Sequence, residues 1–268
     1  MSPRSRGWLI GAVLLIARRD APAEDVDATD PGAAAPCAMA AAPADPDAAS
    51  PFGPAVNDQA IYAHVLFDEL EGRFGGGSDV PFRWDGEAWV GTDTNRLWIK
   101  SEGFAANGEA SDGDHELLYD RPVSSYFDMQ AGVRYDLDSL GGRGWAALGI
   151  EGLAPEFFDV SATVYASDAE HYAAKLIANY DELLTQRWIL QPLVELNLYS
   201  RPDPERQVAA GLSDLDAGLR LRYEFSRKIA PYIGVVYERI YGPGRSSGPF
   251  DTGRAGAWRL AAGLRAWL

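Results

Sequence analysis

Cysteine, histidine and methionine are scarce in this chain of 268 residues, which contains one cysteine, three histidines and three methionines. The single cysteine, Cys37, excludes an intramolecular disulfide framework and any pair of cysteines at metal-binding spacing. Long apolar runs are missing as well, since no stretch approaches the roughly 18–20 apolar residues that a membrane-spanning helix needs. The sequence therefore argues against a helical inner-membrane protein but leaves a membrane barrel of strands open.

Positive charge is also scarce. The chain has 24 Lys and Arg against 39 Asp and Glu, a net charge of −15 at pH 7. Contact with phosphate needs clustered Lys and Arg, so this balance argues against a nucleic-acid partner. A net negative charge is equally consistent with a role in keeping the protein soluble and with a role in attracting cations. An apolar content of 47 % favours a folded protein over wholesale disorder.

The first 57 residues are expected to lie outside the folded domain. A basic start, a short apolar core at Trp8–Ala17 and the small residues Ala21–Ala23 predict a signal peptide over residues 1–23. Residues 24–57 are rich in Ala, Pro and Asp and have almost no large apolar side chains. Such a segment cannot bury a core, so it predicts a disordered periplasmic arm before a domain at residues 58–268.

Alternation of apolar and polar residues runs through the rest of the chain and is clearest at Leu212–Phe225. One face carries Leu215, Ala217, Leu219, Leu221, Tyr223 and Phe225, and the other carries Asp214, Asp216, Gly218, Arg220, Arg222 and Glu224. A strand between lipid and a wet lumen needs this pattern, whereas a soluble sandwich strand rarely does. The sequence predicts an all-β fold, a transmembrane antiparallel β-barrel.

Turn residues divide this region into about twelve strands by the alternation rules. The expected strands are Leu66–Arg73, Phe82–Val90, Arg96–Glu102, Glu116–Val123, Phe127–Leu137, Arg143–Leu153, Phe157–Ala166, Tyr172–Asp181, Arg187–Tyr199, Leu212–Phe225, Ile229–Ile240 and Trp258–Leu268. Odd-numbered connections are mostly long or acidic, among them residues 103–115, and even-numbered ones are tight. This sorting is typical of an outer-membrane barrel with both termini in the periplasm.

Many polar side chains are expected to face the lumen by parity. They are Gln130, Arg134, Asp136, Thr163, Lys175, Asn179, Asp181, Gln191, Glu195, Asn197, Asp214, Asp216, Arg220, Arg222, Glu224 and Glu238. Mixed charges at this density indicate either ion-pair networks that fill a narrow barrel or a charged constriction, because about twelve strands enclose a modest lumen. Met129 alternates with apolar residues and is expected to face lipid.

Sequence motifs for catalysis are missing. The chain has no G-x-S-x-G elbow, no H-E-x-x-H pair and no phosphate-cradling glycine loop. We therefore expect neither an enzyme nor an organic cofactor.

Specific strings resemble the copper resistance protein B family. They are Leu117–Arg121, Phe127–Arg134, Leu183–Arg187, Gly218–Glu224 and Ala230–Val235, in this order along the chain. The resemblance implies an outer-membrane barrel of Gram-negative bacteria that handles copper ions and supports copper tolerance. Its implied partners are membrane lipid, copper ions and a periplasmic copper-binding protein. The alternative is a structural or general-diffusion barrel without a specific metal role.

The arm departs from the Met- and His-rich arm usual in that family, because it offers only Cys37 and Met39. His115 and His171 fall on long connections expected on the extracellular side, while His64 is expected near the periplasmic rim. Residues 102–116 carry five acids and no Lys or Arg. The hypothesis is an acidic mouth with His115 and His171 as copper ligands, alongside Cys37 and Met39 in the arm. The alternative is that these histidines are simply solvated loop residues.

Overall fold

The computed structural model describes residues 60–75, 80–106, 109–138, 142–204, 206, 208–241 and 256–268. The predicted signal peptide and arm, with Cys37 and Met39, lie outside the described residues, and so the prediction of these segments stays untested. Among the described residues, no helix is long and apolar enough to span a membrane.

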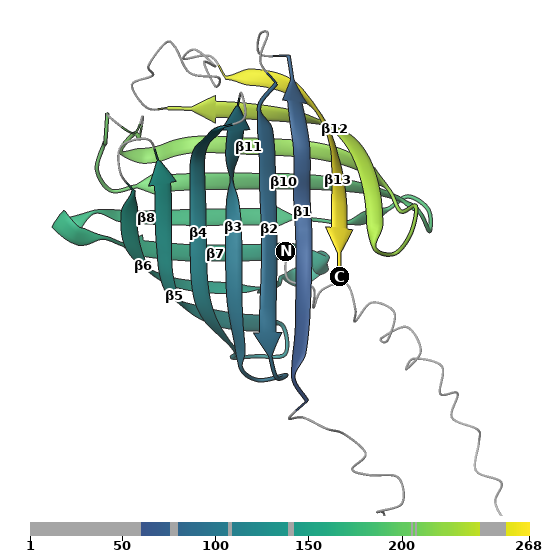
Figure 1. Ribbon diagram of the computed structural model, residues 1–268, viewed down its shortest axis with the longest axis horizontal. Helices are drawn as coiled ribbons and strands as arrows, with labels where there is room; N and C mark the ends of the chain where they lie inside the picture. The colour runs from purple at the N-terminus through teal and green to yellow at the C-terminus, as the bar shows by residue number, and fades with distance from the viewer. Residues whose placement is uncertain are drawn as a thin grey trace, which may run out of the picture.

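The described residues form thirteen strands (Figure 1). They are β1 (Tyr62–Phe74), β2 (Phe82–Gly91), β3 (Arg96–Ala106), β4 (Glu109–Pro122), β5 (Phe127–Asp138), β6 (Arg143–Leu153), β7 (Asp159–Ala166), β8 (Tyr172–Asn179), β9 (Glu182–Leu183), β10 (Trp188–Tyr199), β11 (Gly211–Tyr223), β12 (Ile229–Ile240) and β13 (Ala257–Trp267). Two single-turn 3-10 helices, η1 (Pro155–Phe157) and η2 (Asp168–Glu170), precede β7 and β8.

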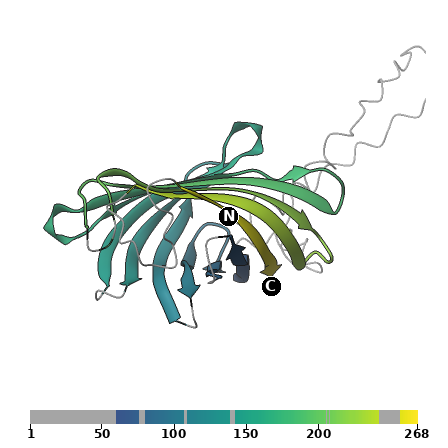
Figure 2. The same cartoon turned by 90° about the horizontal axis from the view of Figure 1, so that it is seen from above.

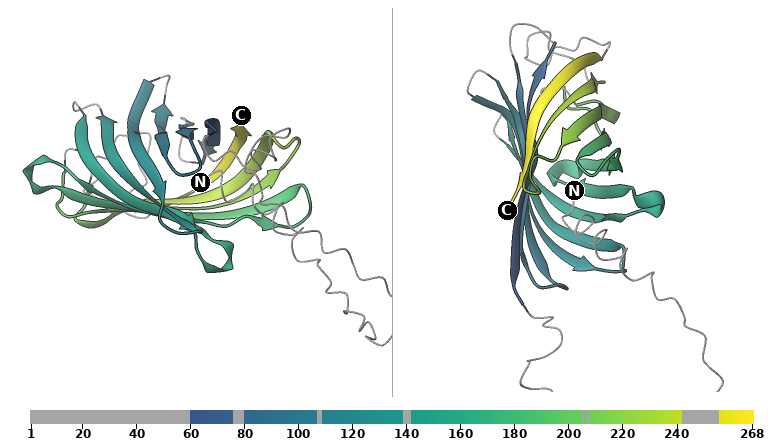
Figure 3. Two further views of the ribbon diagram at one scale, coloured as in Figure 1. Left: turned by 90° about the horizontal axis from the view of Figure 1, so that it is seen from below. Right: turned by 90° about the vertical axis from the view of Figure 1, so that its right-hand side faces the viewer.

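The sheet closes into a barrel. Each long strand pairs antiparallel with its sequence neighbour, and β13 pairs with β1 to complete the ring. The two-residue β9 pairs with β10 beyond the end of β8, so twelve long strands form the wall. In Figure 1, β2–β5 stand vertically, in alternating directions, in front of β7, β8, β10 and β11, which lie across the page. Figures 2 and 3 show the curvature of the wall. The predicted antiparallel barrel of about twelve strands is confirmed.

The distribution of side chains is the reverse of that in a soluble protein. On the outer face Ile233 and Leu260 expose 65 % and 63 % of their surface, whereas Glu71 and Arg73 on the inner face expose none. An apolar exterior around a charged interior is the arrangement of a barrel that spans a membrane. The predicted alternation between lipid and lumen therefore holds in the structure.

Aromatic side chains mark both ends of the outer wall. Tyr126 and Trp188 lie at the end where the short turns and both barrel termini are found, and Tyr237 and Trp258 lie at the other end. Such belts occupy the lipid–water boundary. By the general rule for these barrels, the end with short turns is periplasmic and the other end is extracellular.

The prediction of a long loop at residues 103–115 is wrong. β3 extends to Ala106 and β4 begins at Glu109, so His115 is a strand residue paired with Ser101 and Tyr135. Asp114 is accommodated in β4 because a cation in the lumen compensates its charge. Asp114 lies 2.6 Å from Arg134.

Candidate functional site in the barrel lumen

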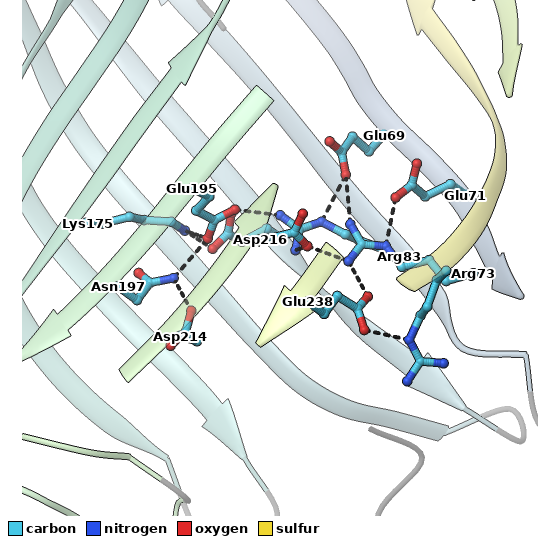
Figure 4. Close-up of polar contacts among 12 residues, drawn as sticks. Glu69, Glu71, Arg73, Arg83, Lys175, Glu195, Asn197, Asp214, Asp216 and Glu238 are labelled. Carbon is cyan, nitrogen blue, oxygen red and sulfur yellow. Dashed lines mark hydrogen bonds and ion pairs between the residues drawn. The ribbon is translucent and has the colours of Figure 1, made fainter. Parts of the chain in front are cut away.

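An ion-pair network centred on Arg73 fills part of the lumen (Figure 4). The Arg73 guanidinium at the end of β1 donates from Nε to Glu71 at 2.8 Å and also pairs with Asp216 of β11 and Glu238 of β12. Arg259 of β13 donates from Nε to the same Glu238 at 2.6 Å. Three neighbouring strands and β1 are thus linked inside the barrel.

Arg220 of β11 holds the two glutamates of β1. Its Nε and Nη2 donate to the Glu71 carboxylate at 3.0 and 2.9 Å, and Nη2 lies 2.8 Å from Glu69. This bidentate geometry is the strong form of the arginine–carboxylate pair. All three side chains are almost completely buried.

The network also crosses the lumen. Arg83 of β2 contacts Glu69 at 2.9 Å and Glu195 of β10 at 2.8 Å, although β1, β13, β12 and β11 separate β2 from β10 along the wall. Lys175 of β8 pairs with Glu102 of β3 and lies 3.5 Å from Glu195. These residues form what we call the lumen network: Glu69, Glu71, Arg73, Arg83, Glu102, Lys175, Glu195, Asp216, Arg220, Glu238 and Arg259. All of them except Arg220 lie in the extracellular half of their strands.

A cavity of about 1210 Å³, the vestibule, adjoins the lumen network and shares Glu102 and Lys175 with it. Its lining includes Tyr62, Ser124, Tyr126 and Phe157, which belong to the periplasmic end of the barrel. Its charged lining consists of nine carboxylates and three cations: Asp85, Glu87, Asp93, Glu102, Asp114, Glu116, Asp128, Glu151, Asp159, Arg96, Lys100 and Lys175. The vestibule therefore reaches the periplasmic end and carries an excess of negative charge.

Ion pairs link several of these carboxylates to cations of the lumen. Lys100 lies 2.6 Å from Glu151 and donates to Gln130 at 3.1 Å, and Arg96 lies 3.5 Å from Asp128. An excess of one sign between low-dielectric walls concentrates counter-ions. No group of three or more His, Cys, Asp or Glu able to hold a metal ion occurs among the described residues. The vestibule thus has more carboxylates than cations in its lining and no preformed metal centre among the described residues.

His64 is the histidine that lines the vestibule. Its ring stacks between Trp267, at 5.6 Å, and Trp89, at 6.3 Å. His64 lies near the periplasmic rim, as expected, but it is not one of the copper ligands predicted from the sequence. His64 is two residues before Leu66 in β1, so both side chains lie on the same face of the strand. Because Leu66 is buried in the barrel, the alternation predicts that His64 also faces inward.

The structure does not bring His115 and His171 together. His115 follows the outward parity of Leu117 and Tyr119, so it lies on the outer wall beside Tyr135 and not at the mouth. His171 follows η2 in the connection before β8, with Nδ1 3.3 Å from the Asp168 carbonyl oxygen. A shared copper site at an acidic mouth, as hypothesised from the sequence, does not follow from these positions.

Most of the predicted inward residues face the lumen, among them the buried Gln130, Arg134 and Lys175, but the sequence-based set omitted the charges of β1 and β2. A β-bulge between Phe67 and Glu69 in β1 changes the parity, so Asp68 and Glu69 are both buried. A strict period of two cannot place both residues on one face. Met129, in contrast, is 45 % exposed, as expected for a residue on the outer wall.

At the extracellular end, the connection between β10 and β11 is tied to β6. Asp203 accepts hydrogen bonds from Arg143 at 2.9 Å and from Arg206 at 3.2 Å. Burial alone would raise the pKa of Asp203, but these hydrogen bonds outweigh it and hold the pKa below its ordinary value. The Asp203 carboxylate therefore stays ionised, and keeps this contact, well into the acidic pH range.

Comparison with known proteins matches this arrangement to one family. A family model described as Copper resistance protein B precursor (CopB) matches residues 61–268. The chain belongs to the copper resistance protein B family. Copper resistance protein B of Escherichia coli is 40 % identical over 216 residues, which cover 81 % of this chain and 73 % of the relative. The Copper resistance protein B homolog of Pseudomonas syringae pv. tomato matches with the same identity and coverage.

Solved structures agree with the fold. The NanC porin covers 76 % of this chain and 99 % of its own, with a TM-score of 0.50 and 12 % sequence identity, a likeness that shows the fold alone. The barrel and its family together identify a copper-resistance barrel of the outer membrane. The resemblance expected from the sequence is confirmed.

Proposed function

We propose that the barrel admits copper ions to the vestibule from the periplasmic end and holds them there weakly as part of copper tolerance. The observation that carries this proposal is the excess of nine carboxylates over three cations in a cavity that reaches the periplasmic end. Oxygen and imidazole ligands suit Cu²⁺, and His64 supplies an imidazole at the same cavity. The role is one of binding and exchange, without catalysis or an organic cofactor.

Weak, exchangeable binding is the expected mode. Tight copper sites need several ligands at fixed geometry, and the described residues contain no such group. A divalent ion would instead be retained by the field of the carboxylates and would exchange readily. A periplasmic copper-binding protein is the partner that this arrangement fits, because the mouth of the vestibule faces its compartment.

A general-diffusion barrel is the alternative, and the lumen network argues against it. Free diffusion of solutes needs a water-filled passage, whereas Arg73 and Arg220 are buried between carboxylates of β1, β11 and β12. These side chains would have to separate from their partners before a solute could pass. Separation is costly, since it leaves buried charges unpaired.

Copper binding to the purified full-length protein tests the proposal against the ligands expected from the sequence. We expect the copper affinity of a His115→Ala, His171→Ala double variant to stay within about twofold of the parent, because neither imidazole lines the vestibule. A Cys37→Ser, Met39→Leu variant is expected to behave likewise. Isothermal titration with Cu²⁺ measures both. Loss of copper binding in either variant would show that the replaced residues bind copper, and it would contradict binding in the vestibule.

A further inference from the structure

Arg239 is a cation on the outer wall of the barrel. Along β12, Ile233 and Val235 are exposed on the outer face, while Glu238 points inward to Arg73 and Arg259. By this alternation Arg239 faces outward, one residue before the extracellular end of the strand. Its register partner on β11 is Leu215, an apolar residue of the same outer face.

The Arg239 guanidinium has no carboxylate partner among the residues that the structure describes. It lies over the ring of Tyr241, at 4.7 Å from the ring centre, and its Nε is buried without a hydrogen-bond partner in that part of the chain. By contrast, Arg73, Arg83, Arg220 and Arg259 all have carboxylate partners inside the barrel. An unpaired cation on a lipid-facing wall is unfavourable unless it meets an anion at the membrane surface.

The surroundings of Arg239 place it at that surface. Tyr237 and Trp258 pack against each other with ring centres 5.0 Å apart, and Trp258 is 69 % exposed. These residues belong to the extracellular aromatic belt, which lies at the level of the lipid headgroups. The Tyr241 N–H donates to the Ser213 carbonyl at 2.7 Å and so fixes the end of β12 against β11.

We propose that Arg239, with Tyr241 beneath its guanidinium, binds a phosphate group of a phosphorylated glycolipid in the outer leaflet. A guanidinium presents two parallel N–H donors that match phosphate oxygens, and the aromatic ring beneath it holds its plane. The neighbouring Leu215, Tyr237 and Trp258 are suited to the acyl and sugar portions of such a lipid. This inference rests on the outer-membrane location and is independent of copper.

Lipid binding to the full-length protein in detergent tests the inference. Native mass spectrometry titrates the parent, Arg239→Gln and Arg239→Lys with diphosphorylated lipid A. We expect about tenfold weaker binding for Arg239→Gln, the loss of a charge-assisted pair, and an intermediate value for Arg239→Lys. Arg201→Gln is the matched control, because Arg201 lies at the same end but pairs with Glu170 at 2.7 Å and is exposed. Its lipid affinity is expected to equal that of the parent.

Two further probes separate the sources of phosphate. Lipid A without phosphates is expected to bind the parent as weakly as phosphorylated lipid A binds Arg239→Gln, and inorganic phosphate is expected not to compete at equal concentration. Equal lipid A affinity of the parent and Arg239→Gln would overturn the inference, as would equal binding of phosphate-free lipid A. Effective competition by inorganic phosphate would overturn the assignment to a lipid. Heat-modifiable migration on gels confirms that each variant is folded.

Discussion

Replacement of Arg220 by alanine is expected to lower the free energy of unfolding by about 3–5 kcal/mol. Arg220 contacts both Glu69 and Glu71, and all three side chains are buried. Without the guanidinium, two carboxylates of β1 remain close together in the lumen with Arg73 and Arg83 as their remaining cations. Urea-induced unfolding of the protein in lipid vesicles, followed by tryptophan fluorescence, measures the change.

Arg201→Ala serves as the control for this prediction. Arg201 pairs with Glu170 at 2.7 Å, but the two side chains are 52 % and 75 % exposed. Pairs exposed to solvent contribute about 0–1 kcal/mol, so this variant should unfold almost like the parent. An Arg220→Ala variant as stable as Arg201→Ala would mean that the lumen network does not hold β1 and β11 together.

The second large effect is expected from the vestibule. We expect the triple variant Asp85→Asn, Glu87→Gln, Asp159→Asn to bind copper roughly tenfold to a hundredfold more weakly. A carboxylate about 8 Å from a divalent ion contributes about 1 kcal/mol in water before salt screening, and three such charges are removed. Amide side chains keep the shape of the lining, so the change is in charge. Isothermal titration with Cu²⁺ at low ionic strength measures the affinity.

Removal of the same charge elsewhere gives the control. Glu156, Glu170 and Glu182 are exposed residues in connections or the short β9, and none lines the vestibule. Their triple replacement by glutamine is expected to leave copper affinity within about threefold of the parent, since water screens exposed charges. An equal loss in both triple variants would attribute the effect to overall charge and contradict a role of the vestibule.

The strands could be predicted because lipid and lumen impose opposite requirements on alternate residues. Leu219 and Arg220 are adjacent in sequence, yet one is 49 % exposed on the outer wall and the other is buried among carboxylates. The sorting of connections into long and short ones likewise follows from the two sides of one membrane. Both signals are local in sequence, so neither needs knowledge of the closed barrel.

The partners inside the lumen could not be predicted in this way. Glu71 and Arg220 are 149 residues apart, and which strands face each other depends on closure of the whole barrel. Because β1 has a bulge between Phe67 and Glu69, strict alternation does not place both Asp68 and Glu69 in the lumen. The acids around His115 indicated a loop because the cation that compensates Asp114, Arg134, comes from another strand.

The candidate site was only partly accessible from the sequence. Resemblance to the family indicated copper, and parity placed most inward side chains, but the vestibule is the volume that these side chains leave unfilled. Its lining combines residues from β1 to β8 with the periplasmic turns. His64 was therefore overlooked, whereas His115, which alternation places on the outer wall, was selected for its neighbouring acids.

The proposed function is tested most directly by measuring from which side of the membrane copper reaches the vestibule. Trp89 lines the vestibule and stacks on His64, so a copper ion bound there should quench its fluorescence. In vesicles with the barrel in one known orientation, we expect Cu²⁺ to quench rapidly when added on the periplasmic side and slowly when added on the extracellular side. The rapid component should weaken in Trp89→Phe, and the part that remains comes from Trp267, which also stacks on His64. Equal quenching from both sides, or quenching unaffected by Trp89→Phe, would contradict a vestibule that opens to the periplasm and is closed beyond it by the lumen network.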